Sequence, residues 1–137
     1  MKYLLAGLVL FILSCLVYKY LLAEDDPESY KTALAQQKND FTVPKDSAEI
    51  IWQRAGIYLR KNASLIGGGS LQENDSVFFL PYYSDHKKGS SIKIEKHLTV
   101  DSVSFLVQWW YSQKLQINGS KAIALFMQHN LEKSDFR

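Results

Sequence analysis

The sequence predicts an α+β domain behind an N-terminal apolar segment: a helix, three or four antiparallel strands and a second helix, with the helices on one sheet face. Residues 3–22 form one apolar run. Apolar residues then recur at helical spacing over residues 47–61 and from residue 122 to about residue 131. Between these two stretches, apolar and polar residues alternate, as they do in half-exposed strands.

The apolar run from Tyr3 to Leu22 has the length of a membrane-spanning helix, which needs about 20 residues. Its one charge, Lys19, lies near the far end, where a long side chain can reach the membrane interface. Lys2 precedes the run and favours a cytoplasmic N-terminus with an exported C-terminal part. We therefore expect residues 1–23 to be a transmembrane anchor or signal segment.

Three fates are compatible with this segment. It can be kept as an uncleaved single-span anchor. It can be a lipoprotein signal, since Ile12-Leu13-Ser14-Cys15 resembles a bacterial lipobox with Cys15 as the lipidation site. It can also be a secretory signal that is removed after Ala23. All three place residues 24–137 outside the cytoplasm, facing the periplasm or the cell exterior.

Charge and cysteine content narrow the function of the exported part. All 14 acidic residues follow Ala23, whereas two of the 16 basic residues, Lys2 and Lys19, precede it, so the part after residue 23 is formally neutral. This neutrality removes the electrostatic case for a nucleic-acid partner. The single cysteine lies in the apolar run, so we expect the domain to depend on its core and not on a disulfide.

Residues 24–43 are expected to form a stalk between the membrane segment and the domain. Asp26-Pro27 is a favourable helix start, and residues 28–38 can form a short helix with a thin apolar stripe. Val43-Pro44 requires an extended residue before the proline and marks the domain boundary. We therefore expect the domain over residues 44–134 and a tail at residues 135–137.

The clearest element of the domain is a helix from about Ser47 to Lys61. Asp46 or Ser47 can cap this helix, and Glu49 is placed for a capping box with Asp46. Its apolar residues share one helical face: Ile51, Ala55, Tyr58 and Leu59, flanked by Trp52.

The middle of the domain predicts strands, because it alternates and is rich in β-branched and aromatic residues. We expect strands over residues 76–83, 92–98 and 102–112, with an edge strand and a bulge over residues 65–72. Turns are expected at residues 84–90 and 99–102. A second helix follows the break at Asn118-Gly119-Ser120 and ends near Leu131.

Some of these residues carry a resemblance to a group of uncharacterised bacterial exported or membrane-anchored small proteins. In that group an extended Val-Pro precedes a helix with a Trp-x-Arg-Ala pattern, an antiparallel sheet follows, and an Ala-rich helix comes last. The matching residues here are Val43-Pro44, Trp52-Gln53-Arg54-Ala55, Tyr58 and Ala122 to Ala124. The resemblance implies the fold, and it implies no activity.

The aromatic run Trp109-Trp110-Tyr111 is the set most relevant to binding. On a strand, Trp109 and Trp110 point to opposite faces, so one of them enters the helix-covered core. The other, with Leu106 and Gln108, either forms an exposed partner surface or is covered by the stalk helix or a loop. We take Leu106, Gln108 and Trp110 as the candidate partner surface.

Glu95 and His97 are weak acid–base candidates, because they would share one face of a strand. The other interpretation is a solvent-facing polar row that includes Lys93 and Thr99. Both interpretations place the two side chains on the same face, so their surroundings distinguish them.

The remaining motifs provide no enzyme signature. His86 is expected in a solvated turn, and His129 in the partly buried stripe of the last helix. Gly67-Gly68-Gly69 lacks the residues of a phosphate-binding loop and is expected to be a turn or bulge. The Asn-x-Ser sequons begin at Asn62, Asn74 and Asn118; they predict glycans in a eukaryotic secretory chain and mark turns in a bacterium.

We therefore expect a membrane-anchored extracytoplasmic protein that binds or assembles with a protein partner in the cell envelope, without catalytic residues, a metal or another cofactor. The alternative is a small cystatin-like or NTF2-like envelope enzyme or ligand carrier. That alternative requires a cone-shaped pocket into which Glu95 and His97 both point.

Overall fold

The computed structural model describes residues 26–66, 69–81 and 89–136 and has an α+β fold. The helices are α2 (Glu28–Gln36), α3 (Lys45–Ile66) and α4 (Ile117–His129), and a 3-10 turn, η1 (Lys133–Phe136), follows α4. The strands are β1 (Asp40–Pro44), β2 (Gln72–Glu73), β3 (Val77–Leu80), β4 (Ser90–Leu98), β5 (Ser102–Tyr111) and β6 (Lys114–Leu115).

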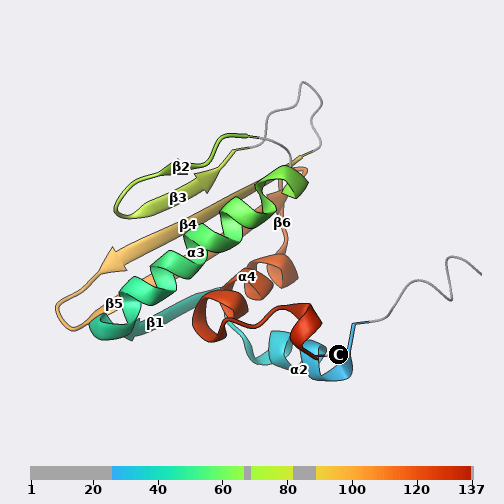
Figure 1. The fold of residues 1–137 in the computed structure, drawn as a ribbon, viewed down its shortest axis with the longest axis horizontal. Helices are drawn as coiled ribbons and strands as arrows, with labels where there is room; N and C mark the ends of the chain where they lie inside the picture. The colour runs from blue at the N-terminus through green and yellow to red at the C-terminus, as the bar shows by residue number, and fades with distance from the viewer. Residues whose placement is uncertain (1–25, 67–68, 82–88, 137) are drawn as a thin grey trace, which may run out of the picture.

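The six strands form one antiparallel sheet in the order β1-β5-β4-β3-β2, and β6 pairs with the end of β5. Figure 1 shows α3 and α4 on one face of this sheet, with α2 beside α4. The predicted α+β class is confirmed. The sheet has more strands than expected, because β1 and β6 join the strands that the alternation predicts.

Residues expected in the stalk instead belong to the folded unit. Strand β1 pairs with β5 along its whole length, from Asp40 opposite Leu106 to Pro44 opposite Ser102. Helix α2 packs onto the domain as well, since the ring centroids of Tyr30 and Phe136 lie 5.3 Å apart. The expected boundary at residue 44 therefore falls inside the fold. The residue pattern of this segment does not reveal that it belongs to the fold, because the residues that contact α2 and β1 lie far along the chain.

The membrane segment expected at residues 3–22, including Cys15, lies outside the described residues. In the part of the chain that the structure describes, no helix has both the length and the apolar character needed to cross a bilayer. The described chain begins at Asp26, which forms an ion pair with Lys133 of η1. Asp26, the first described residue, therefore lies at the α2–η1 end of the domain.

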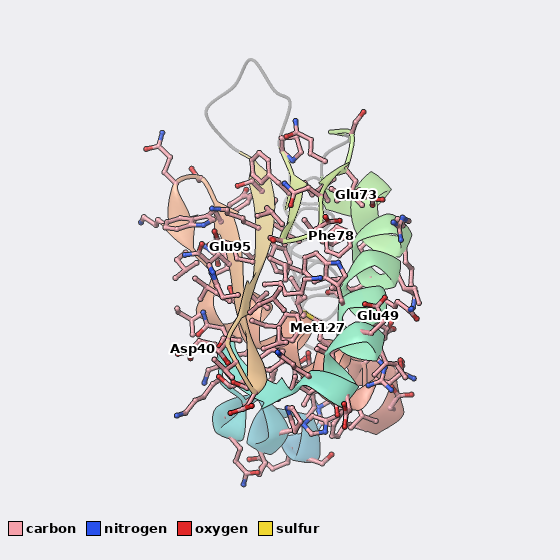
Figure 2. The ribbon with its side chains drawn as sticks, turned by 90° about the vertical axis from the view of Figure 1, so that its left-hand side faces the viewer. Asp40, Glu49, Glu73, Phe78, Glu95 and Met127 are labelled. Atoms are coloured by element: carbon pink, nitrogen blue, oxygen red, sulfur yellow. The ribbon has the colours of Figure 1, made fainter. Side chains whose placement is uncertain are left out.

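The hydrophobic core lies between the sheet and the helices. Figure 2 shows Phe78 and Met127 in this layer, whereas Asp40 and Glu95 lie on the other side of the sheet. Strand β5 contributes its alternate residues Val103, Phe105 and Val107, each at most 1% exposed. The helices and β4 supply most of the rest: Ile51, Trp52, Ala55, Leu59, Ile92, Ile94, Ile123, Ala124 and Met127.

Helix α3 is longer than predicted, because it begins directly after Pro44 and continues to Ile66. Asp46 and Glu49 lie inside the helix instead of forming the predicted capping box, and Glu49 Oε1 accepts a hydrogen bond from Gln53 Nε2 at 3.1 Å. The predicted apolar face is buried as expected. On this face the Trp52 ring stacks on Phe78, with 4.1 Å between ring centroids.

Helix α4 begins at Ile117, so the predicted break at Asn118-Gly119-Ser120 lies inside its first turn. Ser120 is fully buried, and its Oγ accepts a hydrogen bond from Trp109 N and donates one to Gln116 O, both at 2.9 Å. These two bonds connect the start of α4 to β5. The helix ends where Asn130 takes the left-handed conformation, with φ of 56°, which asparagine tolerates well.

Strand β5 is also bonded in the short interval between its partners β1 and β6. Asn39 Nδ2 donates to Val107 O at 3.0 Å, and Asn39 O accepts from Val107 N at 2.8 Å. Gln116 N donates to Trp109 O at 2.7 Å. Because an unpaired buried backbone group costs about as much as a lost hydrogen bond, these contacts satisfy the β5 backbone groups that neither β1 nor β6 pairs.

Tyr58 on α3 should make stability depend on alkaline pH. Its ring lies 5.4 Å from that of Phe126 on α4, and burial raises the pKa of its hydroxyl from 10.0 to about 12, with smaller contributions from Tyr30 and Glu132. The unfolded chain releases this proton near pH 10, whereas the folded chain keeps it until about pH 12. Because the unfolded state binds fewer protons in this window, the stability contributed by Tyr58 is complete below pH 10 and is lost as the pH rises.

We expect the free energy of unfolding to fall by up to about 2 kcal/mol between pH 10 and pH 12 through Tyr58 alone. Urea unfolding at stepped pH, on the native chain and on Tyr58→Phe, isolates this effect from the lysines that titrate in the same range. The variant should show the shallower decline. Identical slopes for the two proteins would show that Tyr58 does not titrate in this way.

Candidate functional site

The candidate site is the sheet face that is turned away from the helices, which we call the open face. Strand alternation places Leu106, Gln108 and Trp110 on it, because the intervening residues of β5 face the helices. Trp110 is 36% exposed, whereas Trp109 packs against the core. Helix α2, which could have covered these residues, lies instead beside α4 on the helix side (Figure 1).

Neighbouring strands extend the apolar part of the open face. Leu115 of β6 lies directly opposite Trp110, and the half-buried Val77 and Phe79 of β3 lie on the same face beyond β4. None of these three residues could be recognised from the sequence as part of this surface. Strand β6 is too short to give a periodic signal, and the orientation of β3 depends on its register with β4.

An ion pair lies on β4, between the apolar side chains that β3 and β5 place on the open face. Lys93 Nζ lies 2.8 Å from Glu95 Oε1, and both residues come from β4. Lys93 is opposite Gln108 and Glu95 is opposite Leu106, so the pair lies beside the candidate residues of β5. The Glu95 side chain is 21% exposed, and Figure 2 shows it on the side away from α3. The open face thus combines apolar side chains with a positioned donor and acceptor.

Glu95 and His97 share the open face, as expected, but their surroundings differ. The Glu95 carboxylate is held by Lys93, whereas His97 is exposed and lies opposite Ser104. His97 lines a hollow of about 590 Å³ over β1, β5 and the end of β4. Glu95 is not part of that lining, so the structure does not bring the two residues together into one pocket.

The other features singled out in the sequence lie away from the open face or outside the described residues. His129 is exposed, which corrects the expectation of a partly buried histidine. The physical reason is its position about 200° around α4 from the fully buried Met127. His86 and the first two glycines of the triple-glycine segment lie outside the described residues. The start of the edge strand expected over residues 65–72 is instead the end of helix α3, which continues to Ile66.

The three sequons occupy different local structures. Asn74 lies in the turn between β2 and β3, and its Oδ1 accepts hydrogen bonds from Ser76 N at 2.9 Å and Val77 N at 2.8 Å. Asn62 and Asn118 instead lie in helices, and Asn62 Nδ2 donates to Tyr58 O at 2.8 Å. The interpretation of sequons as turn markers therefore holds for Asn74 and fails for the two helical positions.

The described residues offer no donor set for a metal: within residues 26–66, 69–81 and 89–136, no three His, Cys, Asp or Glu side chains are grouped closely enough. No protein-family model, curated protein or solved structure matches this chain. The suspected relation to exported bacterial proteins consequently stays a prediction. Function is inferred from the geometry of the open face.

Proposed function

We propose that this protein is a membrane-anchored extracytoplasmic module that binds or assembles with a protein partner through its open face. The observation that carries the proposal is the exposed Trp110, with Leu106 and Leu115 on the same face, which none of the described helices covers. Tryptophan is the residue type most enriched among the side chains that dominate protein–protein binding energy.

The make-up of the open face supports a protein partner. A sheet face in contact with solvent normally carries polar residues. Among the described residues, however, this face has five apolar side chains: Val77, Phe79, Leu106, Trp110 and Leu115. The ion pair of Lys93 and Glu95 lies among them. Apolar anchors combined with directional polar groups are typical of interfaces that recognise one partner.

The membrane anchor rests on the apolar run at residues 3–22 and on the basic Lys2 before it. In this arrangement, the N-terminal segment would leave the domain at the α2–η1 end. Intact mass of the protein purified from whole cells separates the three fates: the full-length chain, a chain lipidated at Cys15 and a chain that begins at Glu24.

Trp110→Ala should abolish most partner binding while the fold survives. We expect at least a tenfold loss of partner recovered from membranes, since a central interface tryptophan is worth about 2 kcal/mol or more. The measurement is quantitative recovery after photo-crosslinking, with a photoreactive residue in place of Gln108 in the full chain.

Tyr111→Ala is the matched control, because Tyr111 is the next residue of β5 and is 51% exposed. Strand alternation places its side chain on the opposite sheet face from Trp110. Its loss should leave recovery unchanged. Equal recovery from native chain, Trp110→Ala and Tyr111→Ala would eliminate the open face as the binding surface.

The alternative of an envelope enzyme or ligand carrier that uses Glu95 and His97 gains no support from this geometry. Its requirement was a pocket containing both side chains. His97 lines a broad hollow and Glu95 is held by Lys93 outside that lining.

A further inference from the structure

Strand β1 has a free edge in the described part of the chain. It is the last strand of the sheet and pairs with β5 on its other side. Asn39 O accepts a hydrogen bond from Val107 N, and hydrogen-bonded pairs alternate along antiparallel strands. Phe41 and Val43 therefore direct their backbone groups to β5, and the backbone groups of Asp40 and Thr42 point to the free edge.

A hollow lies along each face of this edge. On the helix side, a hollow of about 490 Å³ lies between β1, α2, α4 and η1, and its apolar walls include Phe41, Leu125 and Phe136. On the open face, the hollow that contains His97 begins at Asp40 and Thr42. Both volumes are in the range of ligand pockets, and Lys38 and Phe41 line both hollows.

We propose that the free edge of β1 binds a short extended peptide segment as an added strand. One apolar side chain of this segment occupies the helix-side hollow, and a neighbouring acidic side chain lies near Lys38 and His129. Strand addition requires an unpaired edge for backbone hydrogen bonds and pockets for alternate side chains, and β1 provides both.

The charge of the residues that line the helix-side hollow favours an acidic peptide segment. This lining includes the Lys38 ammonium group and the His129 imidazole and contains neither aspartate nor glutamate. The wall between them is held in place: Gln37 is 7% exposed, and its Nε2 donates to Lys38 O and to Gln128 Oε1, both at 2.7 Å. A carboxylate would therefore meet positive charge against a fixed wall of amides.

The same edge is less suited to a second copy of this chain. Strand β1 of a second copy would present Phe41 and Val43 toward the helix side, and its Asp40 would lie on the open face. It would thus offer no carboxylate to Lys38 on the helix side. Pro44 also lacks an N–H, so pairing is limited to the few residues before it.

The test uses the full chain in detergent and acetyl-Thr-X-Thr-Z-Thr-Glu-amide peptides, with X and Z varied over alanine, valine, leucine and phenylalanine. Hydrogen exchange followed by NMR reports the amides of Asp40 and Thr42. We expect at least one peptide with leucine or phenylalanine to slow exchange at both amides. If no peptide in the set protects either amide, the proposal is wrong.

Two variants at Thr42 distinguish strand addition from binding in the hollow alone. Thr42→Pro removes the outward N–H, and Thr42→Ala keeps it; both lose the 2.9 Å hydrogen bond with Ser104 Oγ. We expect Thr42→Pro to weaken binding about tenfold and Thr42→Ala to leave it nearly unchanged. Lys38→Glu should weaken binding about threefold or more. Equal affinity for all three variants and the native chain would overturn the proposal.

N-methylated peptides repeat the test on the native chain, in case Thr42→Pro does not fold. Methylation of alternate amides on one edge of the peptide should abolish binding, and methylation on the other edge should not. Concentration-dependent self-association without peptide, lost in Thr42→Pro, would overturn the proposal in favour of a second copy. The variants at Thr42 test the edge of β1 and the variant at Trp110 tests the open face, so failure of either proposal leaves the other standing.

Discussion

Phe105→Ala is expected to lower the free energy of unfolding by about 3–5 kcal/mol. Phe105 is 1% exposed in the central strand β5, and its ring stacks with Phe41 at 5.4 Å and with Trp52 at 6.2 Å. Removal of the ring leaves a cavity between the sheet and α3, where neighbouring side chains from several elements cannot all move inward. Urea unfolding followed by tryptophan fluorescence and by circular dichroism measures the loss.

Phe79→Ala is the matched comparison, because it removes the same side chain from the open face. Phe79 is half-buried and is flanked by solvent, so its loss should cost no more than about 1.5 kcal/mol. The difference between the two variants measures how strongly the core is confined to the helix side. Comparable losses would show that a second apolar layer exists on the open face.

Gly119→Ala is expected to destabilise the protein by about 1–3 kcal/mol, although alanine favours a helix over glycine by about 1 kcal/mol. A Cβ at this position would lie 2.2 Å from Trp109 Cε3 and 2.7 Å from Trp109 Cζ3. The indole is rigid and is packed between β5 and the first turn of α4, so relief requires displacement of the ring or of the helix start. Thermal and urea unfolding give the sign directly.

Asn118→Ala in the same turn is the control, since Asn118 is exposed and its loss should change stability by about 0.5 kcal/mol or less. Trp109→Phe provides a second comparison, because it removes the atoms that the Cβ would strike. Gly119→Ala should cost less in that background, which is a direct coupling between the two positions. A gain in stability from Gly119→Ala in the native chain would refute the close packing of Trp109 against α4.

The two central strands could be predicted closely from sequence. The expected strand over residues 102–112 corresponds to β5, and the one over residues 92–98 corresponds to β4. Apolar and polar residues alternate there because one face of each strand packs against the core and the other is more exposed to solvent. The β-branched residues also favour the extended backbone. The turn at Thr99 was predicted as well, and its N–H donates to Ser102 O at 2.9 Å.

The edge strands could not be predicted in this way. Strands β2 and β6 have two residues each, which is too short for any period, and β1 contains a proline that favours a boundary. Their strand character comes from pairing with β3 and β5. The same limit applies to the candidate site, because Leu115 and Phe79 join the open face through the register of their strands.

The spacing of apolar residues along the sequence was sufficient to establish the α+β class, the two central strands and the opposite orientations of Trp109 and Trp110. These features depend on intervals of two or about four residues, which backbone geometry imposes on any chain. Which sheet face stays open, and which edge stays free, depended on where α3 and α4 pack and on β1 returning to pair with β5. Those contacts join residues far apart along the chain, so only the assembled fold shows that Trp110 is exposed and that the edge of β1 has no partner strand among the described residues.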